Sequence, residues 1–455
     1  MRASRRLIPL FIGAALLLPG CNRIEPWQDP DEMVVAILAD PVFYQPALAD
    51  GEAGGFDYDL IRAFADELNL KVRVVTAQSP AQLRELMAEG AVRFAASAPI
   101  QPWADYRYSQ PLHDARLLVV QHADEIPLDE PADLAGQSIE VSADGAAEQA
   151  LRKLPIAASL TVKPAAEVND MDIIAHIQER RADLVATDSV HLAVANIYYP
   201  DLAVAQELPG KIAYGWVFRA DDDALRAQAD AFIAKFKADG RLARLADRYF
   251  GNVNRINPIG TAQFIDDIRN RLPKFRIFFQ HAQAATGLDW RLLAALAYQE
   301  SKWDPLATSY TGVRGLMMLT EETADRMHVG NRLDAQESIM AGARYLADLI
   351  DELPDEIKRP DRQWFGLAAY NLGMGHLNGA RQFAVGLKRD PTSWYEMKKV
   401  LPLMARPEYY ARLKSGRARG GEAVILVENV RTYYDILARF EPVAHSPLQT
   451  GLTMQ

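Results

Sequence analysis

The sequence predicts an α/β domain followed by an all-α domain, and three observations support this prediction. A chain of 455 residues is too long for one ordinary hydrophobic core, so two or three domains are expected. Short β-like runs alternate with amphipathic helices from Met33 to Gly251, which is typical of an α/β domain. From about residue 264 onward the apolar residues recur at helical spacing, which indicates an all-α domain.

Composition and charge narrow the class of protein. Apolar residues make up 49% of the chain and charged residues 24%, which is near the average and argues against a disordered or fibrous protein. The formal net charge is -10 and the pI is about 5.4. A phosphate backbone would meet a surface of its own sign, so no nucleic-acid partner is expected.

Residues 1–21, "MRASRRLIPLFIGAALLLPGC", have the layout of a secretory signal, because three arginines precede a short apolar run. That run is too short to span a bilayer comfortably as a helix. Cys21 is the single cysteine, so an intrachain disulfide is excluded. The "LPGC" stretch resembles a bacterial lipoprotein box, in which the cysteine carries the lipid; the alternative is ordinary cleavage nearby.

A lipid on Cys21, or a retained apolar segment, would tether the protein to a membrane that faces the periplasm. Asn22 is compatible with sorting to the outer membrane in lipoproteins of this kind. We therefore expect a membrane-anchored protein on the periplasmic face of the outer membrane.

The α/β domain is expected to span residues 33–251, with mainly parallel sheets and enough length for two lobes. Three of its segments, "GFDYDLIRAFADELNLKVRVV", "DLAGQSIEVSADGAAEQAL" and "ADLVATDSVHLAVA", resemble the periplasmic solute-binding proteins. These proteins capture amino acids between two hinged lobes. The resemblance implies a two-lobed periplasmic-binding-protein-like fold and a small amino acid or cell-wall peptide (muropeptide) as ligand.

The ligand residues of that family are matched in part. Asp188 matches the acid that receives a ligand ammonium, and Ser142 lies where a loop and a helix N-terminus hold a carboxylate. The alternative for Asp188 is a solvated or capping aspartate at a strand end. An arginine is expected after the third strand, but Trp103 and Ala104 stand there and Arg107 is out of register. A bidentate clamp for a carboxylate is therefore not predicted.

Residues 252–263 lose hydrophobic periodicity and supply asparagine, glycine and proline, so we expect a linker there. The helical domain is expected over residues 264–440, followed by a flexible tail over residues 441–455.

Glu300 in the helical domain lies at a position where the helical pattern predicts an apolar residue such as leucine. Asp289 can cap a helix, and Glu300 lies four residues after Leu296 on its apolar stripe. Pro305 disfavours helical conformation at the residue before it, so the helix should end within a few residues of Glu300. Partial burial without a cationic partner would raise the pKa of this carboxyl and suit it to donate a proton near neutral pH. The alternative is a structural ion pair, for example with Lys302 or with an arginine from another helix.

Two further segments accompany this helix. "ATSYTGVRGLMMLT" is a loop in which Gly312 and Gly315 permit close backbone approach, and "FGLAAYNLGMGH" brings Tyr370 and Asn371 to the end of another apolar helix. In this order and spacing, "ES", "GLMM" and "AAYN" resemble the soluble lytic transglycosylase domain. That domain is a goose-type lysozyme-like helical fold that cleaves bacterial peptidoglycan.

The resemblance implies roles for individual residues. Glu300 matches the single catalytic acid/base, and Ser309 matches the serine that orients a substrate N-acetyl group. Tyr370 and Asn371 match the pair that hydrogen-bonds the acid and the sugar. Tyr433 or Tyr434 matches a tyrosine in the wall of the substrate groove. The family usually has glutamine at the last position of the "GLMM" segment, and Met318 replaces it here, which removes one hydrogen bond to the sugar.

The implied reaction needs one carboxylate, whereas ordinary glycosidases need two. Glu300 would protonate the glycosidic oxygen between N-acetylmuramic acid and N-acetylglucosamine, and the sugar's own C6 hydroxyl would close onto C1. The enzyme would thus be a lyase that leaves a 1,6-anhydromuramoyl end. No metal or other cofactor is expected, because the few histidines lack ligand spacing. The rivals are a lysozyme-type hydrolase and a non-catalytic lipoprotein that senses or binds amino acids or peptides. A further hypothesis couples ligand binding in the first domain to activity in the second.

Overall fold

The computed structural model describes the chain except residues 1–30, 46–52, 101–104, 254, 412–415 and 445–455. The predictions for the signal segment, Cys21 and Asn22 fall outside the described residues, as do Trp103 and Ala104. Within the described part of the chain, no helix combines the length and the apolar character needed to cross a membrane.

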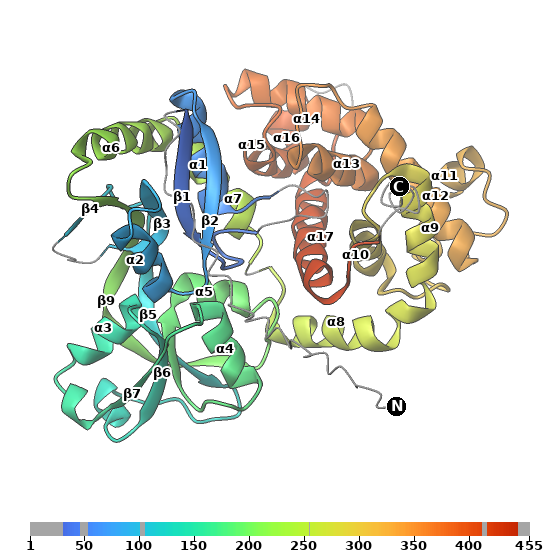
Figure 1. Cartoon of the computed structure of the whole chain (residues 1–455). Helices are drawn as coiled ribbons and strands as arrows, with labels where there is room; N and C mark the ends of the chain where they lie inside the picture. The colour runs from blue at the N-terminus through green and yellow to red at the C-terminus, as the bar shows by residue number, and fades with distance from the viewer. Residues whose placement is uncertain (1–30, 46–52, 101–104, 254, 412–415, 445–455) are drawn as a thin grey trace, which may run out of the picture.

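The first half of the chain is built on one mixed sheet (Figure 1). Its order within the described residues is β2-β1-β3-β9-β5-β8-β6-β7, with β4 paired to β9. The strands are β1 (Glu32–Leu38), β2 (Lys71–Ala77), β3 (Phe94–Pro99), β4 (Tyr106–Tyr108), β5 (His113–His122), β6 (Ser138–Ser142), β7 (Thr161–Ala165), β8 (Val185–Asp188) and β9 (Leu202–Arg219).

The expectation of a mainly parallel sheet was wrong. The pairs of β1 with β2 and β3, and of β6 with β7 and β8, are parallel. β5 and β9 instead run antiparallel to their neighbours. The cause is β9, a single strand of 18 residues that lies between the two parallel groups and pairs antiparallel with β3, β4 and β5.

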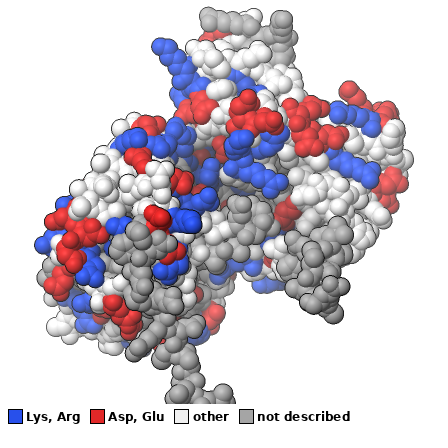
Figure 2. Space-filling view, turned by 45° about the horizontal axis from the view of Figure 1, so that its top comes forward, with Lys and Arg blue, Asp and Glu red and all other residues white. Residues whose placement is uncertain are grey.

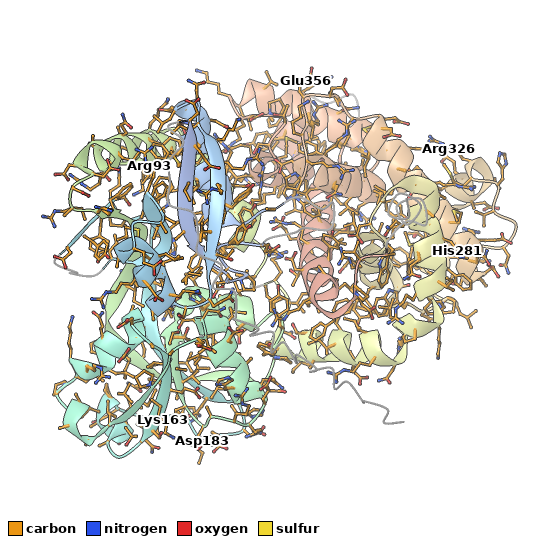
Figure 3. All side chains as sticks on the ribbon, viewed as in Figure 1. Arg93, Lys163, Asp183, His281, Arg326 and Glu356 are labelled. Atoms are coloured by element: carbon orange, nitrogen blue, oxygen red, sulfur yellow. The ribbon has the colours of Figure 1, made fainter. Side chains whose placement is uncertain are left out.

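Two lobes share the long strand β9. Lobe 1 contains β1 to β4 with helices α1, α2, α6 and α7, and lobe 2 contains β5 to β8 with α3, α4 and α5. Each lobe has its own apolar core, and Val42 and Phe43, which follow β1, pack into the core of lobe 2. Arg93 lies in lobe 1, and Lys163 and Asp183 lie toward the far end of lobe 2 (Figure 3). The helices are α1 (Phe56–Glu67), α2 (Pro80–Ala88), α3 (Ala146–Arg152), α4 (Asp170–Gln178), α5 (Ser189–Ala195), α6 (Asp223–Ala238) and α7 (Arg241–Phe250).

The second half of the chain is helical, as predicted, and has its own core (Figure 1). The apolar helix α10 lies inside it: every residue from Trp290 to Tyr298 is buried. The helices are α8 (Pro258–Asn270), α9 (Arg276–Thr286), α10 (Trp290–Ser301), α11 (Glu321–Arg326), α12 (Ala335–Asp351), α13 (Asp361–Leu372), α14 (Met374–Gly386), α15 (Trp394–Val400), α16 (Pro407–Tyr410) and α17 (Gly420–Phe440). The helical half thus has a hydrophobic core that includes no described residue of the sheet.

The two halves meet along α17. The Arg431 guanidinium donates to the backbone carbonyls of Asp247 (3.0 Å) and Arg248 (2.8 Å), and the Thr432 hydroxyl donates to the carbonyl of Asn252 (3.0 Å). A cavity of about 510 Å³ lies beside these contacts and is lined by charged residues of both halves. Figure 2 shows basic and acidic side chains around the hollow between the two halves. None of the candidate catalytic residues lines this cavity.

Two boundaries differ from the prediction. The expected linker already contains the start of α8, because the Asn257 side chain caps the helix by accepting from the amide of Gly260 at 2.8 Å. The start of the expected tail is also held. Glu441 pairs with Arg276, and the carbonyl of Ala444 accepts from the Gln283 side chain at 3.1 Å.

Candidate active site

The helix that carries Glu300 begins and ends as its sequence predicts. The Asp289 carboxylate accepts from the amide of Arg291 at 2.8 Å and caps the start. The helix ends at Ser301, and Lys302 and Trp303 follow with φ of 54° and 56°. The Trp303 indole is buried and donates to the carbonyl of Ala294 at 2.9 Å, which holds this sharp turn in place.

Glu300 is half-buried in the last turn of α10. Burial alone raises the pKa of its carboxyl to about 7. No ion pair to this carboxylate occurs among the described residues. The alternative of an ion pair with Lys302 is not found among the described residues; the Lys302 ammonium instead donates to the Tyr433 hydroxyl at 2.9 Å. A large share of the molecules therefore carry this proton near pH 7, and nearly all of them do at lower pH.

The glycine-containing loop lies against the end of this helix. The Ser301 hydroxyl contacts the carbonyl of Leu316 at 2.8 Å, which joins the helix end to the loop. Gly315 has φ +81°, and a Cβ at this position would lie 1.8 Å from the carbonyl oxygen of Arg332. Only glycine permits this approach. Gly312 also has positive φ, but nothing lies within 4 Å of its Cβ position, so it is a turn residue.

Tyr370 lies close enough to Glu300 for that carboxylate to influence it. Burial first, and then the nearby Glu300, hold the pKa of Tyr370 well above its usual value. Its hydroxyl donates to the carbonyl of Met317 at 2.7 Å, so it ties α13 to the loop. In this structure the Tyr370 proton is thus used by the loop backbone. The neighbouring Asn371 is exposed at the end of α13.

Ser309 lies in the loop after α10. Its hydroxyl oxygen accepts from the amides of Thr311 (3.2 Å) and Val313 (3.3 Å) and also contacts the Thr311 hydroxyl at 2.8 Å. Three local contacts hold the side chain, so its orientation is fixed by the turn. These contacts give Ser309 a structural role in the turn.

The two tyrosines of α17 point to opposite ends of α10. Tyr433 is buried and contacts Lys302, just after Glu300. The Tyr434 hydroxyl instead donates to Asp289 at 3.0 Å, at the start of the helix. Tyr433 is therefore the one of the pair placed near the acid. Burial raises its pKa to about 12, so its hydroxyl keeps its proton.

Sequence reasoning assigned no role to Ser301 or to the Lys302 contact. Ser301 directly follows the acid, which was a signal that the motif continues beyond Glu300. The contact between Lys302 and Tyr433 joins residues 131 positions apart and had no local signal.

Three other carboxylates near Glu300 in the sequence lie in positions that have a structural role. Asp304 is exposed and accepts from the amide of Leu306 at 2.9 Å, and Glu321 and Glu322 are exposed in the first turn of α11.

The expected ligand residues of the first half, Asp188 and Ser142, lie at the ends of β8 and β6 in lobe 2. Asp188 is buried, and its carboxylate is used within the protein: it accepts from the amides of Val190 (2.7 Å) and His191 (3.1 Å), from the His191 ring (2.5 Å) and from the Tyr214 hydroxyl (2.5 Å). Ser142 is buried, and its hydroxyl has no hydrogen-bond partner among the described residues. Arg107 is exposed on β4, where its guanidinium donates to the carbonyl of Tyr106 at 3.0 Å.

Comparison with known families gives a match to each half of the chain. The family described as bacterial extracellular solute-binding proteins, family 3, matches residues 33–252. The family described as transglycosylase SLT domain matches residues 277–389, a range that contains Glu300, Ser309, Tyr370 and Asn371.

Individual relatives match nearly the whole chain. A protein of Nitrosospira multiformis named membrane-bound lytic murein transglycosylase F is 38% identical over 97% of this chain and 94% of its own length. A protein of Ectopseudomonas mendocina with the same name is 37% identical over 94% of this chain and 90% of its own length.

Solved structures match about half of the chain. A mutant of ArgBP from T. maritima is 21% identical with a TM-score of 0.44, covering 49% of this chain and 96% of that one. The GluR0 ligand-binding core from Nostoc punctiforme, in complex with (L)-glutamate, is 19% identical with a TM-score of 0.42, covering 48% of this chain and 99% of that one. On the sequence relationships over nearly its full length, the chain belongs to the family of the membrane-bound lytic murein transglycosylases F.

Proposed function

We propose that this protein is a peptidoglycan lytic transglycosylase in which Glu300 is the catalytic acid and base. The observation that carries the proposal is the state of this one carboxyl. It is half-buried at the end of an apolar helix, burial raises its pKa to about 7, and no basic side chain pairs with it among the described residues. A general acid must carry a proton at the pH of the reaction, and a pKa of about 7 allows this near neutral pH. The transglycosylase SLT domain match includes this residue.

The proposed reaction uses Glu300 twice. Its carboxyl proton moves to the glycosidic oxygen between N-acetylmuramic acid and N-acetylglucosamine as the bond from that oxygen to C1 breaks. The N-acetyl oxygen of the muramoyl residue stabilises the positive charge at C1. The Glu300 carboxylate then takes the proton of the C6 hydroxyl, and that oxygen bonds to C1. The product has a 1,6-anhydromuramoyl end, and Glu300 is protonated again.

Neighbouring residues supply contacts to the glycan in this proposal. Asn371 is exposed at the end of α13, directly after Tyr370, and in this proposal it offers both a donor and an acceptor to the sugar. The Tyr433 hydroxyl accepts from Lys302, which leaves its own proton to a substrate oxygen. Ser309 orients the N-acetyl group, and Tyr370 fixes the loop that lies beside the acid. Met318 replaces the glutamine usual in the motif, so one hydrogen bond to the glycan is absent.

Attachment to a membrane is part of the proposal. The relatives are named membrane-bound, and a secretory-signal-like segment precedes Cys21. A lipid on Cys21 would place the enzyme on the periplasmic face of the outer membrane, next to its polymeric substrate. Metabolic labelling with a radioactive fatty acid tests this point: the wild-type chain should be labelled and Cys21→Ser should not.

The first half is proposed to bind a small ligand and to influence turnover. Its match to solute-binding proteins supports binding, and the hydrogen bonds of Arg431 and Thr432 to lobe 1 and its connecting segment give α17 a direct link to it. Deleting residues 33–251 tests the influence on turnover. A deletion protein that folds and releases muropeptides at the wild-type rate would contradict it.

The decisive experiment for the proposed reaction is mass analysis of muropeptides released from isolated cell wall by the purified protein. Products one water lighter than hydrolysis products are expected, whereas a lysozyme-type hydrolase would give the hydrated ends. Glu300→Gln keeps the shape of the side chain and should lower release by about 10²- to 10⁴-fold, the usual contribution of a general acid. Glu322→Gln is the matched control, because that glutamate is exposed on α11. A Glu300→Gln protein with wild-type release would refute Glu300 as the general acid, and a wild-type protein without release would identify a non-catalytic binding protein.

A further inference from the structure

A cluster of buried ionisable residues lies where the two lobes of the first half face each other. Asp40, Asp188 and His191 are each no more than 1% exposed. Asp40 follows β1 of lobe 1, whereas Asp188 and His191 belong to β8 and α5 of lobe 2. The cluster is far in sequence from the proposed catalytic residues, and the proposed reaction does not use it.

His191 contacts an acid of each lobe. Its Nδ1 lies 2.5 Å from Oδ2 of Asp188, and its Nε2 lies 3.4 Å from Oδ2 of Asp40. The second contact is an ion pair without hydrogen-bond geometry, since both of its atoms lack a hydrogen-bond partner among the described residues. The imidazole ring therefore bridges one carboxylate in each lobe.

The charge on the bridge follows from its surroundings. Burial opposes a charge on His191, but Asp188 and Asp40 outweigh it and hold the His191 pKa well above the usual 6.5. Burial raises the pKa of Asp188, but His191 and the Tyr214 hydroxyl reverse this and bring it to about 2. A second buried histidine, His113, stacks on the Tyr214 ring with 4.9 Å between ring centroids, and burial lowers its pKa to about 4. His191 is thus the cation of this cluster, and His113 is neutral at pH 7.

Further contacts cross the same boundary. The Asn169 side chain, at the start of α4, donates to the carbonyl of Ala39 at 3.2 Å. The Phe43 ring packs against His191 with 5.3 Å between ring centroids and against Tyr214 with 5.5 Å. The remaining acid near the bridge is Asp170, whose pKa burial raises to about 6. The carboxylate, amide and ring contacts together join the segment after β1 to lobe 2.

Breaking such a bridge is costly, because removal of one partner leaves a buried charge without its counter-charge. Asp188, which the sequence suggested as the partner of a ligand ammonium, is already paired with His191 in this bridge. The ammonium group of a free amino acid would have to displace the His191 ring, whose Nδ1 lies 2.5 Å from the Asp188 carboxylate.

We infer that His191 is a built-in cationic link between Asp188 of lobe 2 and Asp40 of lobe 1, which holds the two lobes together without a bound solute. The link occupies the ammonium position at Asp188, so a free α-amino acid is excluded from that carboxylate. A ligand of the first half has to be recognised through other groups.

Hydrogen–deuterium exchange of the full chain tests the link. Asp40→Asn is the sharpest variant, since Oδ1 of Asp40 accepts from the Val42 amide at 2.8 Å and asparagine keeps that bond while it removes the charge facing His191. We expect exchange in residues 39–44 and 168–172 to become about tenfold faster or more. Unchanged exchange in both segments would overturn the inference.

The control breaks a similar pair within one lobe. Nδ1 of His176 lies 3.0 Å from Oε1 of Glu140, and both residues belong to lobe 2. Glu140→Gln should leave exchange in residues 39–44 and 168–172 at the wild-type rate. If Glu140→Gln and Asp40→Asn speed exchange equally there, the effect is general destabilisation and the link is refuted.

Chemical rescue gives a second, independent measurement. His191→Ala removes the ring and leaves a space beside Asp188, which added imidazole can fill. We expect faster exchange in residues 39–44 in His191→Ala and a return toward the wild-type rate with millimolar imidazole. In wild-type protein, neither imidazole nor free amino acids should change exchange at the lobe boundary. Protection of the wild-type boundary by a free amino acid would contradict the inference.

Discussion

The hydroxyl of Tyr433 accepts a hydrogen bond from the Lys302 ammonium at 2.9 Å, two residues beyond Glu300. The ammonium also lies over the Tyr298 and Tyr433 rings, at 4.3 and 4.9 Å from their centroids. Burial lowers the pKa of Lys302, and the nearby Asp267 opposes this. The contact joins the turn after α10 to α17, the helix that also touches the solute-binding half.

The Lys302 and Tyr433 side chains should act as one unit. Lys302→Met and Tyr433→Phe are each expected to lower kcat/KM for cell-wall release about five- to tenfold, since each removes a hydrogen bond to a charged group. The double variant should lose little more than either single one, which corresponds to a coupling energy of about 1 kcal/mol. Additive losses in the double-mutant cycle would show that the two side chains act separately. Tyr434→Phe, at the other end of α10, is the control for a lost tyrosine hydroxyl.

Turnover should fall on the alkaline side of neutrality. Glu300 must carry its proton to start the reaction, and burial sets its pKa at about 7. We expect kcat/KM to be constant well below pH 7 and to fall about tenfold per pH unit well above it. Initial rates of muropeptide release in buffers of constant ionic strength check this. An alkaline limb near pH 4.5, the ordinary value for glutamate, would contradict the burial of the acid.

Glu300→Gln should stabilise the protein at high pH. The folded-state pKa of about 7 lies above the ordinary 4.5, so the folded state holds the proton more tightly than the unfolded state. Wild-type stability is therefore lost as pH rises from about 4.5 to 7, by up to about 3 kcal/mol. Glutamine has no such cost. Denaturant titrations should show the variant to be more stable at pH 8 and equal to wild type near pH 4. Equal stability at both pH values would refute the prediction.

Gly315 and Gly312 provide a matched pair of loop substitutions. Gly315→Ala places a Cβ 1.8 Å from the Arg332 carbonyl oxygen at a positive φ and should cost about 3 kcal/mol or more. Gly312→Ala meets only the positive φ and should cost about 1–2 kcal/mol. The free energy of unfolding measures both. A smaller effect at Gly315 than at Gly312 would show that the loop relaxes around the added methyl group.

Local sequence signals predicted the position of the acid well. The Asp289 cap, the apolar stripe and Pro305 defined α10, and the structure ends it at Ser301 as expected. These signals work because each acts within a few residues of the chain. The predicted combination of an α/β half and a helical half was confirmed for the same reason.

Contacts between distant segments could not be predicted. The Lys302–Tyr433 and His191–Asp40 contacts join residues from different helices, strands and lobes, and no local pattern encodes them. Sequence reasoning offered Asp188 as either a ligand residue or a cap. The structure shows that it caps α5, but the second histidine contact depends on how the lobes pack. The antiparallel course of β9 was missed because its alternation is the same in either direction.

The continuity of β9 constrains how this architecture is inherited. Leu202 to Arg219 form one unbroken strand, paired with β5 in one lobe and with β3 and β4 in the other. A recombination event that replaced a single lobe would have to cut this strand and re-create its register on both sides. Exchange between related genes should therefore move the two lobes as one cassette, with crossover points before β1 and after α7.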